Sequence, residues 1–154
     1  MSIANLLKKN DYNIFSDKML QLNPNVVVRK STTEKLLRNN ETTIIKTSDF
    51  TSRNGKVKIE FSASVFGLVD NGNVLIIRLS RNGESIGVCD FASDGISSNR
   101  VNKPMNFTFI DEGCPIDVEQ TYQLDATNTS VGGQYNCYVS YSNRSLTELI
   151  ISDV

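Results

Sequence analysis

Strict alternation of apolar and polar residues over 55–64 constrains the fold of this chain more than any other feature. The apolar positions in GKVKIEFSAS are Val57, Ile59, Phe61 and Ala63. The positions between them carry lysine, glutamate or serine. A period of two puts the two sets on opposite faces of a strand, one buried and one wet, as in an antiparallel sheet.

Further strand-like segments follow at short intervals along the chain. They lie at 42–47, 74–81, 84–91, 105–112, 118–127, 135–141 and 145–154. Asn82-Gly83 supplies the positive φ angles of a tight turn, so 74–81 and 84–91 should form a hairpin. Without a long helix between them, these strands predict an all-β antiparallel sandwich or jelly roll of about eight strands, a head domain over 41–154.

Residues 1–40 do not share this alternation, and we interpret them as a mostly non-β N-terminal arm. Within it, Ser31 lies three residues before Glu34, a capping-box spacing that predicts a short helix over 31–40. The rest of the arm has apolar side chains and no partner segment of its own, so it should attach to something. Its candidate anchoring residues are Leu6, Leu7, Tyr12, Phe15, Leu20 and Leu22.

Charge is distributed unevenly along the chain. Residues 1–60 hold 11 Lys+Arg against 6 Asp+Glu, a net of +5, whereas 61–154 hold 5 against 11, a net of −6. A basic arm suits an acidic neighbour or the next subunit's body; the alternative is a chance fluctuation among solvated charges. The chain has no basic run with interleaved aromatics, the pattern that would predict nucleic-acid binding. It also has no apolar run long enough to predict membrane insertion.

The absence of histidine argues against several kinds of chemistry. It removes Ser-His-Asp and Cys-His arrangements and zinc sites of standard spacing. Several carboxylates gather in the second half of the chain: Asp90, Asp94, Asp111, Glu112, Asp117 and Glu119. Two of them could act as acid and base on a glycosidic bond, but polar strand faces and loops commonly carry such residues, so they do not specify a glycosidase. We therefore expect no enzyme, metal or cofactor. Cys89, Cys114 and Cys137 should be buried and reduced, as in a reducing compartment.

The start of the chain lacks the long apolar segment and cleavage site of a secretory signal, so we expect no standard secretion. We expect assembly in the cytoplasm.

The order of these segments resembles the trimeric jelly-roll heads of the C1q/TNF-like class, as found in fibre-head and virion proteins. The hairpin NVLIIRLSRNGESIG, then MNFTFIDE, TYQLDA and the final SLTELIISDV carry the resemblance. The front, NLLKKNDYNIFSDKMLQL, is similar to the start of virion proteins of large DNA viruses. No collagen-like stalk precedes the head, which favours a small capsid-surface or spike head over a long fibre.

The resemblance implies a homotrimer on the virion surface that contacts other capsid proteins through its arm. The candidate residues of the subunit interface are Phe107, Phe109, Tyr135, Tyr138 and Tyr141, with an intrachain core as the alternative. Polar loops over 92–104 and 128–134 lead to the hypothesis of host attachment. Its candidate residues are Asp94, Ser97, Asn99 and Arg100.

A second reading of the same fold is a carbohydrate-binding, lectin-like jelly-roll module with an incidental basic arm. Oxygen ligands for calcium are available at Asp90, Asp94, Asn99 and Asp111, but they lack the spacing of an ordered calcium loop. A host surface glycan is the partner that this reading implies.

Overall fold

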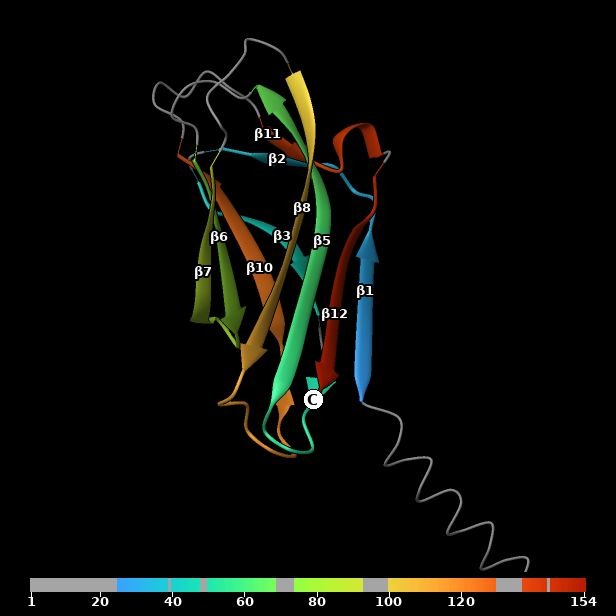
Figure 1. The fold of residues 1–154 in the computed structure, drawn as a ribbon, viewed down its shortest axis with the longest axis vertical. Helices are drawn as coiled ribbons and strands as arrows, with labels where there is room; N and C mark the ends of the chain where they lie inside the picture. Colours follow the sequence, from blue (N-terminus) through green and yellow to red (C-terminus); the bar gives the residue numbers. More distant parts are fainter. Residues whose placement is uncertain are drawn as a thin grey trace, which may run out of the picture.

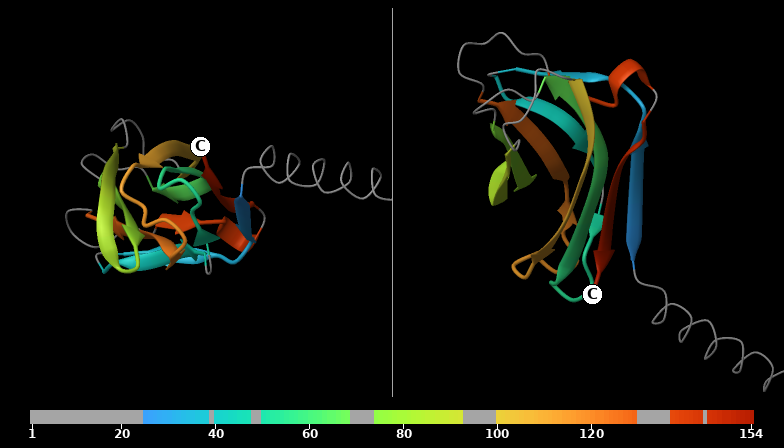
Figure 2. Two further views of the ribbon diagram at one scale, coloured as in Figure 1. Left: turned by 90° about the horizontal axis from the view of Figure 1, so that it is seen from below. Right: turned by 45° about the horizontal axis from the view of Figure 1, so that its top comes forward.

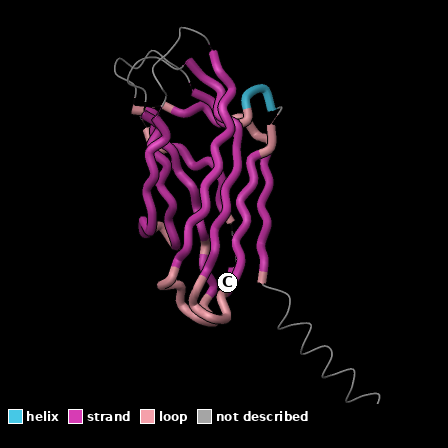
Figure 3. Tube along the Cα trace, in the orientation of Figure 1, coloured by secondary structure: helices cyan, strands magenta, loops and turns pink. Residues whose placement is uncertain are grey.

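Two antiparallel sheets face each other in the computed structural model, which describes residues 25–38, 40–47, 50–68, 74–92, 100–129, 137–143 and 145–154 (Figure 1). The first sheet contains β1 (Val26–Ser31), β2 (Lys35–Leu37), β5 (Val57–Leu68), β8 (Arg100–Asp111), β11 (Cys137–Val139) and β12 (Thr147–Asp153). The second contains β3 (Thr42–Lys46), β6 (Val74–Arg81), β7 (Glu84–Ala92) and β10 (Tyr122–Asn128). A small ribbon pairs β4 (Phe50–Thr51) with β9 (Glu119–Gln120), and η1 (Tyr141–Asn143) is a 3₁₀ turn. The all-β prediction is confirmed (Figure 3).

The strand order is that of a jelly roll. The first sheet reads β1-β12-β5-β8 over its lower part and the second reads β3-β10-β6-β7. Of these eight strands, consecutive ones alternate between the sheets, except for the hairpin β6–β7. Most strands of this arrangement therefore pair with strands that are distant in the sequence and not with the next strand along the chain.

Strand β5 organises the first sheet. Along one side it pairs over its full length with β8, from Val57 opposite Asp111 to Leu68 opposite Arg100. Along the other side its lower part pairs with β12 and its upper part with β11. Figure 2 shows these strands as one curved layer across from the second sheet. Two short strands therefore share the space beside one long strand.

The core lies between the sheets and follows the predicted alternation. Val57, Ile59 and Phe61 of β5 point inward with at most 2% of their surface exposed. They meet inward side chains of the second sheet, among which Ile77 and Leu124 are buried to a similar degree. Each such side chain contributes about 1.5–3 kcal/mol of hydrophobic burial, which is what holds two amphipathic layers together.

The β6–β7 hairpin forms where the sequence predicts it. Asn82 and Gly83 have φ angles of 50° and 85°, the left-handed values that a two-residue turn requires. The Asn82 side chain adds a second connection, since its Oδ1 accepts a 2.8 Å hydrogen bond from the Thr121 N–H. The turn is thereby attached to the start of β10.

The predicted helix over 31–40 is wrong. Ser31 ends β1, and Lys35–Leu37 form β2 against Cys137–Val139. Glu34 does not cap Ser31: its carboxylate accepts a 2.6 Å hydrogen bond from the Ser142 N–H. A helix this short has little stability of its own, so pairing with a distant strand outweighs the local signal. The described part of the sandwich thus starts at Val26, inside the segment interpreted as an arm.

Candidate functional site

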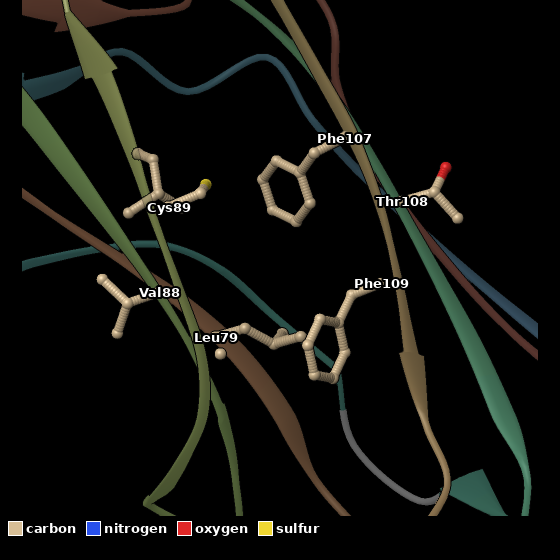
Figure 4. A pocket seen from close by; sticks show the side chains of 8 residues that line it. Leu79, Val88, Cys89, Phe107, Thr108 and Phe109 are labelled. Atoms are coloured by element: carbon tan, nitrogen blue, oxygen red, sulfur yellow. The ribbon is translucent and has the colours of Figure 1, made fainter.

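An apolar slot opens between the two sheets along the flank formed by β7 and β8. Within the described chain, β7 pairs only with β6 and β8 only with β5, so each strand has one unpaired edge on this flank. The slot between them measures about 100 Å³. Its lining residues are Ile77, Leu79, Gly87, Val88, Cys89, Phe107, Thr108 and Phe109 (Figure 4).

Two predicted interface residues, Phe107 and Phe109, form the β8 wall of this slot. Both rings extend from β8 toward β7 and are half-buried (Figure 4). The Phe107 ring lies 5.1 Å from that of Phe61, which anchors it to the core. Phe109 fits because Gly87 opposite has no side chain: a Cβ there would lie 2.9 Å from Phe109 Cε2. Part of each ring serves the core, and part stays open to the flank.

Strand β7 forms the other wall of the slot. Val88 on this strand is 63% exposed, and its side chain points away from Phe107 and Phe109 (Figure 4). Cys89 is exposed as well, so its predicted burial is wrong, whereas Cys114 is buried and Cys137 half-buried. Cys89 points toward Phe107 (Figure 4), and among the described residues no strand pairs with the free edge of β7 in front of it. Partial burial raises the pKa of its thiol, and the neighbouring Asp90 carboxylate raises it further.

The other two described interface candidates lie elsewhere, on the outer face of the first sheet. Tyr138 on β11 pairs with Phe66 on β5. The Tyr141 ring stacks on Phe66 with centroids 4.1 Å apart and lies 5.2 Å from the Tyr138 ring. Phe66 was not singled out from the sequence. Tyr135 lies outside the described residues.

Asp111, named in the sequence as a possible oxygen ligand, is already engaged by protein groups. It is 6% exposed and accepts hydrogen bonds from Arg81 Nη1 at 2.9 and 2.7 Å and from the Tyr122 hydroxyl at 2.9 Å. Burial lowers the pKa of Arg81, but the hydrogen bond and charge of Asp111 outweigh it, so the pKa is raised. This network joins the two sheets. Among the described residues no three His, Cys, Asp or Glu side chains are placed to hold a metal.

The predicted attachment loop is shorter than expected. Strand β7 extends to Ala92 and β8 begins at Arg100, so 100–104 belong to a strand and the loop prediction is wrong there. Arg100 pairs with Leu68 at the upper end of the first sheet. Pairing with the long β5 extends β8 beyond its apolar alternation. The remaining attachment candidates, Asp94, Ser97 and Asn99, lie outside the described residues.

The anchoring candidates Leu6, Leu7, Tyr12, Phe15, Leu20 and Leu22 also lie outside the described residues. In the part of the chain that is described, no helix is long and apolar enough to cross a membrane.

Comparisons with known proteins give a fold likeness without a family. No model of a known protein family matches the chain, and neither does any curated protein sequence. Among solved structures, the chain is similar to one from T=1 particles derived from infectious bursal virus, with 13% identity and a TM-score of 0.54. The match covers 84% of this chain and 32% of that one.

Two further structures align at a similar level of identity. One, from the Gx strain of infectious bursal disease virus, has 14% identity and a TM-score of 0.50, with 86% of this chain and 37% of that chain covered. The other is the CBM36-1 domain of a multidomain xylanase from the hindgut metagenome of Trinervitermes trinervoides. There the identity is 16%, the TM-score 0.41, and 84% and 98% of the two chains are covered.

The two virus-particle chains, with TM-scores of 0.54 and 0.50, support the β-sandwich fold of our chain. Our chain spans about a third of the length of those chains. The C1q/TNF-like trimer remains a prediction.

Proposed function

We propose that this protein is a non-enzymatic structural protein of a virus particle, which associates with copies of itself through the β7–β8 flank. The observation that carries the proposal is the open apolar slot, with half-buried Phe107 and Phe109 inside and the exposed Val88 on the outer face of the strand that borders it. An exposed apolar opening bordered by two unpaired strand edges is a surface that a soluble protein normally covers. The sandwich fold shared with virus-particle chains supports this use.

A closed ring of three copies is the assembly we propose. In a ring, each contact is heterologous, so the flank of one copy meets a different surface of the next. Within the described residues, β1 and β3 each pair along one side only, so we propose the flank that they form for that role. Residues 1–24 are proposed to anchor the ring to other capsid proteins at the virion surface.

The test is the solution mass of Val88→Asp, measured by light scattering after size exclusion. Val88 is 63% exposed, so a charge there should not affect folding, but it should oppose an apolar contact. Val118→Asp is the matched control, because Val118 is 51% exposed, precedes β9 and does not line the slot. We expect a trimer for wild type and control and a monomer for Val88→Asp at the same concentration.

A monomeric wild-type protein at about 100 µM would contradict self-association, since stable assembly requires tighter binding than that. A trimer in both variants would place the contact elsewhere on the surface.

A further inference from the structure

The outer face of the first sheet, which points away from the core, has a shallow depression of about 350 Å³. Its side chains come from three neighbouring strands, β8, β5 and β12. On β5, Ser62 lies at the centre, opposite Asn106 of β8 and Glu148 of β12. Next to it, Glu60 lies opposite Thr108 and Ile150. The hollow forms because the short Ser62 side chain is surrounded by longer ones.

Several hydrogen-bonding groups in this depression are unused. Among the described residues, the side chains of Ser62, Asn106 and Thr108 have no hydrogen-bond partner. Together they offer two hydroxyls and one amide, so both donors and acceptors face the same hollow. A ligand rich in hydroxyl groups would satisfy them.

The two carboxylates of the depression are held by lysines. Glu60 lies 2.8 Å from Lys58 Nζ, and Glu148 lies 2.9 Å from Lys30 Nζ. Each carboxylate has further lone pairs for hydrogen bonds from a ligand. Because each negative charge is matched by a lysine, the depression carries no net charge, which favours a neutral ligand over an anion or a cation.

An aromatic cluster lies farther along the same face. The outward positions of β5 are Glu60, Ser62, Ser64 and Phe66, so Phe66 is about 13 Å from Ser62 along the strand. Phe66 is covered on one side by Tyr141, and Tyr138 lies beside it. Hydrogen-bonding side chains and aromatic rings thus share one stripe along β5.

Tyr141 is held over Phe66 by a strained turn. Ser140, Ser142 and Asn143 all have φ angles of 54–55°, in the left-handed region, which serine rarely adopts and asparagine tolerates better. The turn is fixed by hydrogen bonds: Asn143 Oδ1 accepts one from the Glu34 N–H at 2.8 Å, and Ser140 Oγ lies 2.8 Å from Thr147 Oγ1. Strain of this kind persists only where the surrounding structure fixes it, and it clusters at ligand-binding and other functional sites.

From this arrangement we propose that the outer face of the first sheet binds a neutral oligosaccharide. Sugar hydroxyls bond to Ser62, Asn106, Thr108 and the free lone pairs of the two carboxylates. The C–H face of a neighbouring sugar ring packs on Tyr141 or Tyr138. A protein partner would leave the unused polar groups of the depression buried and in need of exact partners, whereas a sugar brings many hydroxyls of adjustable orientation.

The first experiment follows the amide resonances of the ¹⁵N-labelled full-length protein during titration. The probes are maltotetraose, cellotetraose, N-acetyllactosamine and sialyllactose, each to about 10 mM, which detects binding as weak as about −3 kcal/mol. We expect shifts confined to 58–66, 104–108, 138–143 and 147–150 with at least one neutral sugar. Absence of such shifts with every neutral sugar, or a response to sialyllactose alone, would overturn the proposal.

Two variants then test the site with the sugar that binds best. Asn106→Ala and Tyr141→Ala alter exposed side chains, and each should weaken binding at least tenfold. Val118→Asp should bind as wild type. If Asn106→Ala and Tyr141→Ala bind the sugar as tightly as Val118→Asp does, the sugar binds elsewhere on the protein and the proposal is overturned. Val88→Asp should keep sugar binding as a monomer, so failure of the assembly proposal and of this one can be told apart.

Discussion

Arg81 and Asp111 join the two sheets of the sandwich, because one ends β6 and the other ends β8. Both oxygens of the Asp111 carboxylate accept hydrogen bonds from Arg81 Nη1, and the Gly113 N–H donates to Oδ1 at 3.1 Å. The Tyr122 hydroxyl, from β10, completes the set. One carboxylate at the end of β8 is therefore held by two other strands, β6 and β10, and by the turn that follows it.

Replacing Asp111 by Asn should destabilise the protein by about 3 kcal/mol. The change keeps the shape but leaves the guanidinium of Arg81 without its counter-charge at a site where it is only 18% exposed. Urea unfolding followed by circular dichroism measures the effect. The neighbouring Glu112→Gln is the control, since its ion pair with Lys56 is exposed and should change stability by less than about 0.5 kcal/mol. Equal effects in the two variants would contradict the role assigned to the buried pair.

Tyr122 should make the fold sensitive to alkali. Burial raises the pKa of its phenol well above the ordinary value, and contacts with Cys114 and Asp111 raise it further. The contribution of the Tyr122 hydroxyl to the free energy of unfolding is fully present below pH 10, where tyrosine is neutral in the unfolded chain as well. Above that it falls by about 1.4 kcal/mol per pH unit, because only the unfolded chain releases the proton.

Tyr122→Phe should therefore lose stability at pH 7, by about 1 kcal/mol for the missing hydrogen bond, yet show a shallower decline above pH 10 than wild type. Denaturant unfolding from pH 7 to 11.5 gives both quantities. Parallel declines in the two proteins would show that Tyr122 is not the group responsible.

The thiols should differ sharply in reactivity once the flank is open. Cys89 is exposed, whereas burial raises the pKa of Cys137 to about 11, partly offset by a hydrogen bond from the Tyr138 backbone. In monomeric Val88→Asp, iodoacetamide at pH 8 should label Cys89 at least tenfold faster than Cys137. Peptide mass spectrometry gives the rates. In the wild-type assembly Cys89 should become slow; rapid labelling there would argue against a contact over the slot.

Gly83→Ala should cost about 1–2 kcal/mol through backbone strain alone. Gly83 has a φ of 85°, and an added Cβ would meet no atom within 4 Å, so there is no clash to confuse the result. Glu84→Ala, at the next exposed position, should change stability by less than about 0.5 kcal/mol. A neutral Gly83→Ala would mean that the turn can adopt another geometry at little cost.

The fold was largely predictable from local patterns, and its failures have a physical cause. Alternation over 55–64 and the Asn82-Gly83 turn are decided by neighbours in the chain, and the structure confirms both. Lys35–Leu37 form a strand only because Cys137–Val139 lie beside them, about a hundred residues away. No local pattern carries that information, and the capping-box spacing at Ser31 and Glu34 predicts a helix instead.

The candidate sites were predictable only in part. Phe107 and Phe109 are identifiable from the sequence as aromatics on an alternating strand. The slot that they line also depends on Gly87, which leaves room for the Phe109 ring, and this role is visible only once β7 is known to lie opposite β8. Phe66 and Tyr141 are 75 positions apart, and their stacking follows from strand order. Strand order is what the sequence could not supply.

The position of β12 has a consequence for synthesis of the protein. Its residues lie between β1 and β5, with Val27 on one side and Ile59 on the other of Ile151. Until residues 147–153 have been made, β1 lacks the strand that it pairs with in the described chain, and the lower part of β5 lacks its partner on that side. The chain must hold an unfinished layer in which the inward side chains Val57, Ile59 and Phe61 lack the neighbours that β12 supplies. The yield of native protein should therefore depend on how well this unfinished layer is protected from aggregation.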